Sequence, residues 1–182
     1  LSPSMDILIS SNLERLLFEI TGHDAGKVSV WMEQLKNQGR YEIDPETKNK
    51  VQSIFWADYC NDDQTLMTIR AVWEEWRYLL DTHTAVAVQV YQNYQKETAD
   101  STPTAIMSTA SPFKFGSSVA EAILPEPIRA GKNEFSLMSF LSEWTGYDIP
   151  KGIRDLDKRP VLHQDTTSPA EMRNTVARFL NL

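Results

Sequence analysis

The sequence predicts an α/β fold, of which this chain carries mostly helices and few strands. Apolar residues recur at helical spacing through most of the 182 residues, between capping residues and Gly or Pro. A single short apolar run, Thr104 to Thr109, has the length and composition of a buried strand. The order helix, loop, strand, helix is typical of α/β architecture seen in part. No internal repeat is visible, and we expect residues 1–182 to form a single unit.

Each expected helix begins at a recognisable signal. The pattern of Ser11 followed by Glu14 is typical of a capping box, and Gly22 ends the first helix. Ser111 and Pro112 supply an N-cap and a first-turn proline directly after the expected strand. The expected helices begin at or near the following positions: Ser11, Asp44, Asp62, Ala85, Ser111, Leu137 and Ser168.

The composition excludes several classes of protein. Hydrophobic residues make up 41% of the chain and charged residues 24%, so the chain can bury a core, unlike a disordered polar tract. The 18 Lys and Arg against 25 Asp and Glu give a net charge of −7, whereas nucleic-acid binders need a basic patch. No apolar stretch approaches the roughly 20 residues that span a bilayer. We therefore expect no nucleic-acid partner and no membrane partner.

Metal and secretion signals are also missing from the sequence. The three His and the single Cys60 show no paired spacing of the kind zinc proteins use, and we expect no metal site. The N-terminus lacks the charged and apolar regions of a secretory signal, so we expect a cytoplasmic protein. The chain begins with Leu1 rather than methionine, in what reads as an ordered turn, and we expect a segment excised from a longer protein.

The junction between the expected strand and the next helix is the most informative place for chemistry. Ligands of open α/β sheets bind at the carboxyl ends of strands, where free N–H groups of a helix favour anions. Thr109 and Ser111 could therefore offer hydroxyls to a cofactor, and Lys114 could meet an anion. Alternatively, Ser111 merely caps the helix, Thr109 fills a strand position, and Lys114 is a solvated helix residue.

The stretch from Asp81 to Thr84 is the second candidate. His83 lies between hydroxyl residues at a helix start, which suits a general base or a ligand. Alternatively, Asp81 or Thr82 caps the helix and His83 is a partly buried packing residue. No second acid or base lies at a spacing that would fix a partnership with His83.

Three stretches resemble the threonine synthase family, in the same order. Residues 2–16 resemble its SPSMDI…SNxER segment, residues 81–87 its DPHTAVA motif, and residues 108–115 its TA(S/H)PxKF motif. Thr82 stands where the family usually has proline, so the fixed φ is lost and the roles of Asp81 and His83 stay open. Asn12 and Arg15 match the SNxER residues, and either face the substrate or cap and solvate the first helix.

The resemblance implies a pyridoxal-phosphate enzyme of the tryptophan-synthase-β-like fold, also called fold type II. Such an enzyme is a carbon–oxygen lyase acting on phosphates: it converts O-phospho-L-homoserine and water to L-threonine and phosphate in threonine biosynthesis. The family's chain is longer, and its Schiff-base lysine and glycine-rich phosphate loop belong to the upstream part. We therefore expect no catalytic residue in this chain, and an inactive fragment without the missing N-terminal portion.

One cofactor-binding position carries over through the resemblance. The fold presents a Ser or Thr hydroxyl to the pyridine nitrogen of pyridoxal 5'-phosphate at the end of a strand, and Thr109 matches that position.

Because the run 104–109 would be central in the whole enzyme, the isolated chain should expose apolar surface. Two alternatives remain: another fold-type II lyase or dehydratase, and a non-catalytic helical module that binds a partner through Trp-rich faces.

Overall fold

The computed structural model of the protein describes residues 1–3, 7, 9–162 and 164–181. Residues 4–6 and 8 of the family-like N-terminal segment lie outside the described residues. The chain divides into two compact units, residues 1–150 and 151–182. The prediction that residues 1–182 form a single unit stays a prediction.

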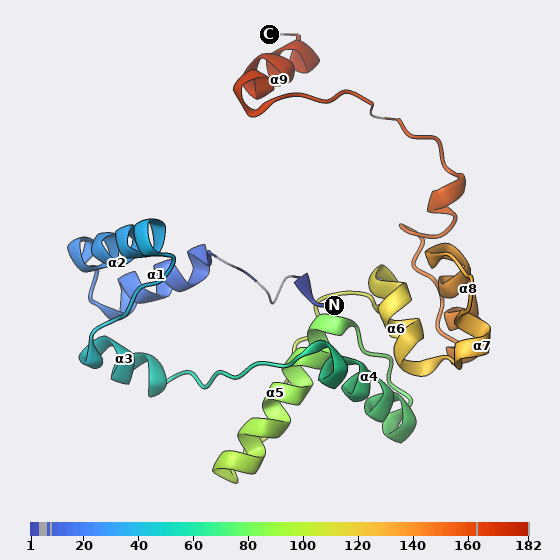
Figure 1. Ribbon diagram of the computed structural model, residues 1–182, viewed down its shortest axis with the longest axis horizontal. Helices are drawn as coiled ribbons and strands as arrows, with labels where there is room; N and C mark the ends of the chain where they lie inside the picture. The colour runs from blue at the N-terminus through green and yellow to red at the C-terminus, as the bar shows by residue number, and fades with distance from the viewer. Residues whose placement is uncertain (4–6, 8, 163, 182) are drawn as a thin grey trace. The chain divides into compact units, whose positions relative to one another are not determined.

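The first three helices pack together around a small apolar core (Figure 1). Leu17, Val28 and Trp31 form this core, with Phe18 and Met32 against it. The second of these helices is not among those expected from the sequence. The three helices are α1 (Ser11–Ile20), α2 (Ala25–Gln38) and α3 (Pro45–Gln52).

The predicted starts of α1 and α3 can be compared with the caps in the structure. The N-cap of α1 is Ser10, whose hydroxyl accepts a hydrogen bond from the Leu13 N–H at 3.2 Å. The capping box predicted at Ser11 is therefore wrong by one residue. The start of α3 is confirmed, because the Asp44 carboxylate accepts from the Thr47 N–H at 2.9 Å.

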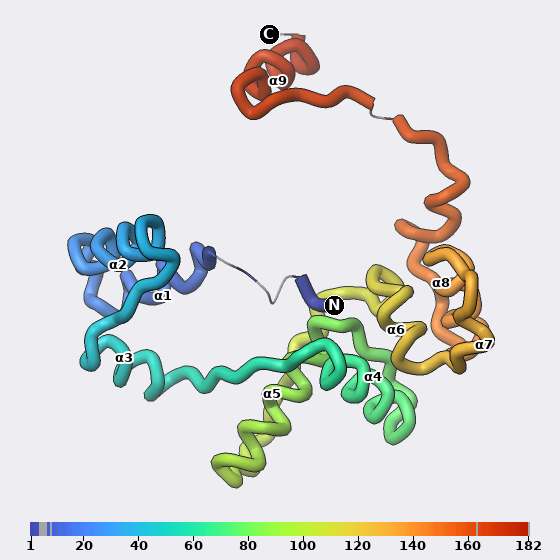
Figure 2. Tube along the Cα trace, in the orientation of Figure 1, coloured from blue at the N-terminus to red at the C-terminus, as the bar shows by residue number. Residues whose placement is uncertain are grey.

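After α3 the chain runs without a helix through residues 53–61, the long connection visible in Figure 2. It then forms α4 (Asp62–Trp76) and α5 (Thr82–Thr98), which pack against each other. The buried face of α4 contains Ile69, Val72 and Trp73, whereas Trp76 is 61% exposed. The predicted helices at these positions are confirmed, although α5 begins at Thr82, three residues before the predicted Ala85.

In the rest of the first unit, helix α6 packs against both α4 and α8. Ala120, Leu124 and Leu137 form the core between α6 and α8. The N-cap at Ser111 is confirmed, since its hydroxyl accepts from the Phe113 N–H at 3.3 Å. Gly146 ends the last helix of this unit in the left-handed conformation, with φ +76°. These elements are the 3₁₀ turn η2 (Pro112–Phe115), α6 (Gly116–Ile123), α7 (Glu126–Arg129) and α8 (Glu134–Thr145).

The second unit contains the 3₁₀ turns η3 (Leu156–Lys158) and η4 (Pro169–Glu171) and the helix α9 (Met172–Leu180). The predicted cap at Ser168 is confirmed, because its hydroxyl accepts from the Glu171 N–H at 3.4 Å. Nowhere in the described ranges is a helix both long enough and apolar enough to cross a bilayer.

The predicted strand from Thr104 to Thr109 is not a strand in this chain. Residues 101–109 carry no regular secondary structure, and the described residues contain helices and turns but no strand. A β ladder needs a second strand to exchange hydrogen bonds with, and the described part of the chain offers none. The α/β prediction is therefore confirmed here only in its helical part.

Gly116 of α6 lies close to the Met138 side chain of α8, and this contact gives the first prediction. A Cβ at Gly116 would lie 2.7 Å from Cγ of Met138, an atom near the root of its side chain. Overpacking of this kind costs about 1–3 kcal/mol, against at most about 1 kcal/mol gained in helix propensity. We expect Gly116→Ala to lower the free energy of unfolding by about 1 kcal/mol in a denaturant titration.

Gly152 provides the matched control for that substitution. A Cβ there meets no heavy atom within 4 Å, so Gly152→Ala should change the free energy of unfolding by less than about 0.5 kcal/mol. Combining Gly116→Ala with Met138→Ala should relieve the clash, so that Gly116→Ala costs less in the Met138→Ala background. Equal effects of the two glycine substitutions would show that the α6–α8 contact is not tight.

Candidate functional site

The N-terminus of α5 gathers the largest group of buried polar side chains in one stretch of the described chain. Asp81, Thr82, His83 and Thr84 are all buried, and Asp81 and Thr82 have no exposed surface. Burying a carboxylate is costly unless hydrogen bonds compensate for the lost water. The structure therefore has to supply partners for Asp81 from within the chain.

Asp81 finds these partners in the first turn of its own helix. Its Oδ1 accepts from the backbone N–H of His83 at 2.9 Å and from that of Thr84 at 3.3 Å. Its Oδ2 accepts from the Thr84 hydroxyl. These donors include N–H groups that no helical carbonyl can satisfy, and a negative charge is favourable at a helix N-terminus. The interpretation of Asp81 as a helix cap is confirmed.

Thr82 occupies the first helical position, directly after the Asp81 cap. Proline is favoured at this position because its missing N–H has no helical acceptor and its φ already suits a helix. A threonine can adopt the same backbone conformation, and here the Asp81 cap holds the turn. The departure from the family's proline therefore leaves the helix start in place.

His83 lies against the 3₁₀ turn η2. Its ring centroid is 4.6 Å from that of Phe115, and the residue is 5% exposed. Its Nδ1 lies 3.4 Å from Oδ1 of Asp81. A ring so enclosed has little surface to offer a substrate in this chain. The arrangement supports the packing interpretation of His83 and links the start of α5 to the segment that follows Ser111.

Thr84 connects this buried cap to the segment predicted as a strand. Its hydroxyl oxygen lies 3.4 Å from the hydroxyl oxygen of Ser108, 24 residues later in the chain. Thr84, Ile106 and Ser108 line an apolar groove of about 310 Å³ together with residues of α4 and α5. Met107, between the two groove residues, is 75% exposed. The segment thus alternates between two faces as a strand does, although it has no neighbouring strand.

Asp100 anchors the loop that leads into this segment. It accepts hydrogen bonds from the Tyr94 hydroxyl at 2.6 Å and from the N–H and hydroxyl of Thr102 at 2.9 and 2.6 Å. These hydrogen bonds favour the charged carboxylate and lower the pKa of Asp100 to about 2. The bond from the Thr102 hydroxyl has the largest effect, followed by the bond from the Tyr94 hydroxyl. The bond to Asp100 in turn raises the pKa of Tyr94. The loop is therefore fixed to α5 immediately before residue 104.

Thr109 lies at the end of this segment, two residues after Met107 and on the same face of it, and Thr109 is exposed. Lys114 is exposed too, and its Nζ lies 5.6 Å from the centroid of the Phe115 ring. Lys114 therefore fits the description of a solvated lysine. Within the described residues, no group of three or more His, Cys, Asp or Glu could hold a metal ion.

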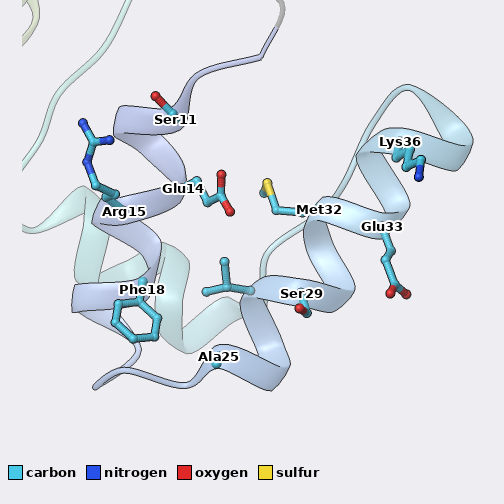
Figure 3. A pocket seen from close by; sticks show the side chains of 10 residues that line it. Ser11, Glu14, Arg15, Phe18, Ala25, Ser29, Met32, Glu33 and Lys36 are labelled. Atoms are coloured by element: carbon cyan, nitrogen blue, oxygen red, sulfur yellow. The ribbon is translucent and has the colours of Figure 1, made fainter. Parts of the chain in front are cut away.

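Asn12 and Arg15 lie in a different part of the first unit. The Arg15 guanidinium donates a hydrogen bond to the Asn12 side-chain oxygen, and both residues are exposed on α1. A groove of about 570 Å³ runs between α1 and α2. Figure 3 shows Glu14 and Met32 pointing toward each other across this groove, whereas Arg15 points away from α2. The structure thus pairs Asn12 with Arg15, and a role toward substrate stays a prediction.

The contact between Thr84 and Ser108 was missed by the sequence analysis. Both hydroxyls stand in stretches that the analysis singled out, at residues 81–87 and 108–115. Spacing along the chain cannot show that the two motifs meet, because 24 residues separate them.

Comparisons with known proteins show what the chain is similar to. Residues 84–161 match the family model "Threonine synthase, C-terminal". The threonine synthase of Pseudomonas aeruginosa is 34% identical over 122 residues, which cover 67% of this chain and 26% of that protein. The threonine synthase-like 1 protein of Homo sapiens is 36% identical over 122 residues, which cover 67% of this chain and 16% of that protein.

A solved structure is similar to the chain as well. The crystal structure of PLP-bound threonine synthase from Brucella melitensis superposes with a TM-score of 0.58 at 35% sequence identity. The superposition covers 79% of this chain and 33% of that chain. The chain therefore spans about a quarter to a third of the threonine synthases that it matches here.

The buried cap at Asp81 gives a prediction on stability. Asp81→Ala removes the cap and leaves the Thr84 hydroxyl and two N–H groups without their acceptor, at a cost of about 2–4 kcal/mol. Asp44→Ala removes a comparable cap from the part-exposed start of α3 and should cost only about 1 kcal/mol. Denaturant titration of both variants measures the difference, and equal losses would contradict the role given to burial.

Proposed function

Residues 84–161 match the family model "Threonine synthase, C-terminal", and from that match we propose that the chain is the C-terminal part of a pyridoxal-phosphate-dependent threonine synthase. The complete enzyme would convert O-phospho-L-homoserine and water to L-threonine and phosphate. The observation that carries the proposal is that the family match spans both Thr84 and the segment ending at Thr109, which the structure brings together.

Thr109 fits a role toward the cofactor. Its side chain is exposed, and its hydroxyl takes part in none of the hydrogen bonds found among the described residues. A threonine hydroxyl can donate or accept a hydrogen bond and carries no charge at neutral pH. It suits a pyridine nitrogen that is held without a full proton, whereas a carboxylate at this position would favour the protonated ring. When bound, pyridoxal 5'-phosphate supplies the electron sink that stabilises a carbanion.

The exposed apolar surface supports the view that the chain needs the rest of the enzyme. Trp76 is 61% exposed and lines a groove of about 310 Å³ formed by α4, α5 and residues 106 and 108, and Met107, on the other face of this segment, is 75% exposed. Large exposed apolar side chains next to an apolar groove are typical of surfaces that another part of a protein covers. We infer that the N-terminal portion of the enzyme covers this face and that its strands pair with residues 104–109, as fold type II requires.

Two further functions stay open as outcomes of the test. Another fold-type II lyase or dehydratase would use the same cofactor on a different amino acid, and a non-catalytic helical module would bind a partner without cofactor. The cytoplasmic location also stays a prediction.

The reaction itself is tested on the complete enzyme. We expect it to release inorganic phosphate from O-phospho-L-homoserine and to form threonine in equal amounts, and the fragment of residues 1–182 alone to release none. A phosphate assay coupled to amino-acid analysis measures both products. A complete enzyme that binds pyridoxal 5'-phosphate but turns over only a different amino acid would support the lyase or dehydratase instead.

Thr109 is tested by substitution in the same complete enzyme. Thr109→Asp should shift the absorption maximum of the bound cofactor and lower kcat by at least about tenfold, because a carboxylate changes the charge facing the ring. Thr109→Ser keeps a hydroxyl and should retain the absorption spectrum. An unchanged spectrum and rate in Thr109→Asp would refute the assignment of Thr109.

A further inference from the structure

Asp81, Thr84 and Ser108 form a chain of polar contacts from the buried start of α5 to the neighbour of Thr109. The Thr84 hydroxyl donates to the fully buried Asp81 carboxylate, and it lies 3.4 Å from the Ser108 hydroxyl. Ser108 directly precedes Thr109 in the chain. Among the described residues, no other hydrogen bond links the segment 104–109 to a helix.

The direction of the hydrogen bonds in this chain follows from the chemistry of the three groups. An ionised carboxylate can only accept hydrogen bonds, and a hydroxyl has a single proton to donate. The structure has Thr84 as the donor in both contacts, to Oδ2 of Asp81 and to Oγ of Ser108 at 3.4 Å. Because a carboxylate is the stronger acceptor, the contact with Ser108 is the weaker of the two.

We propose that Thr84 is a positioning residue that holds Ser108, and with it the backbone that presents Thr109 to the pyridine ring of the cofactor. The inference rests on the proposed function and extends it to a residue that does not touch the cofactor itself. Thr84 and Asp81 are rigidly placed, since both are buried within the first turn of α5. Because side chains alternate along the segment, fixing Ser108 toward the helices directs Thr109 to the opposite face.

The contribution expected of this contact is modest and measurable. A net hydrogen bond of this kind changes an equilibrium by about three- to tenfold. Replacing Thr84 by valine keeps the shape of the side chain and removes both hydrogen bonds. Replacing it by serine keeps the hydroxyl and removes only a methyl group. The two substitutions therefore separate the hydroxyl from the packing.

The experiment uses the complete enzyme, with pyridoxal 5'-phosphate as the probe. We expect Thr84→Val to raise the Kd of the apoenzyme for pyridoxal 5'-phosphate by about three- to tenfold and to shift the cofactor absorption spectrum. Thr84→Ser should restore both values. Ser108→Ala removes the hydroxyl on the other side of the contact, and because Ser108 is exposed the variant should fold. We expect it to change the Kd and the spectrum in the same way, so it tests the proposal even if Thr84→Val does not fold.

Thr65 supplies the matched control for a buried hydroxyl. It is 1% exposed, and its hydroxyl donates to the Asn61 carbonyl at 2.8 Å, without contact to the segment 104–109. Thr65→Val should lower the melting temperature, as Thr84→Val does, while leaving the Kd and the spectrum of the cofactor unchanged.

The outcomes separate this inference from the proposed function. If Thr84→Val and Ser108→Ala lower only the melting temperature, or leave the Kd and the spectrum at wild-type values, the positioning role is overturned and the proposed function stands. If the wild-type complete enzyme binds no pyridoxal 5'-phosphate, both fall together.

Discussion

The buried Asp81 carboxylate is the interaction on which the arrangement of the site depends. It has no exposed surface, so its charge is tolerable only because two backbone N–H groups and the Thr84 hydroxyl donate to it. These bonds begin α5 at Thr82, and the same turn places His83 against Phe115. A single acidic residue thereby connects the start of α5 with the chain on both sides of Thr109.

The second constraint is the backbone of residues 104–109. Its side chains alternate between the groove of α4 and α5 and the exposed face, as in a strand, yet no strand lies beside it among the described residues. Backbone N–H and C=O groups require partners once they are buried. This requirement supports the proposal that strands outside this chain pair with residues 104–109.

Two of the motifs that resemble the family correspond to specific structural features in this chain. The stretch from Asp81 to residue 87 is a buried helix cap, and Thr82 shows that this cap does not need the family's proline. The stretch from Ser108 to residue 115 joins the exposed segment to a 3₁₀ turn that Ser111 caps. Because the motifs touch through Thr84 and Ser108, a substitution in either is expected to act on both.

The sequence by itself determined the features that depend on contacts within about four residues. The caps at Asp44 and Ser111 follow from the hydrogen-bonding preferences of those residues. The sequence could not show that Ser108 meets Thr84, or that residues 104–109 stay unpaired. Both depend on partners far along the chain or outside it, and only the tertiary structure decides which distant groups come within hydrogen-bonding distance.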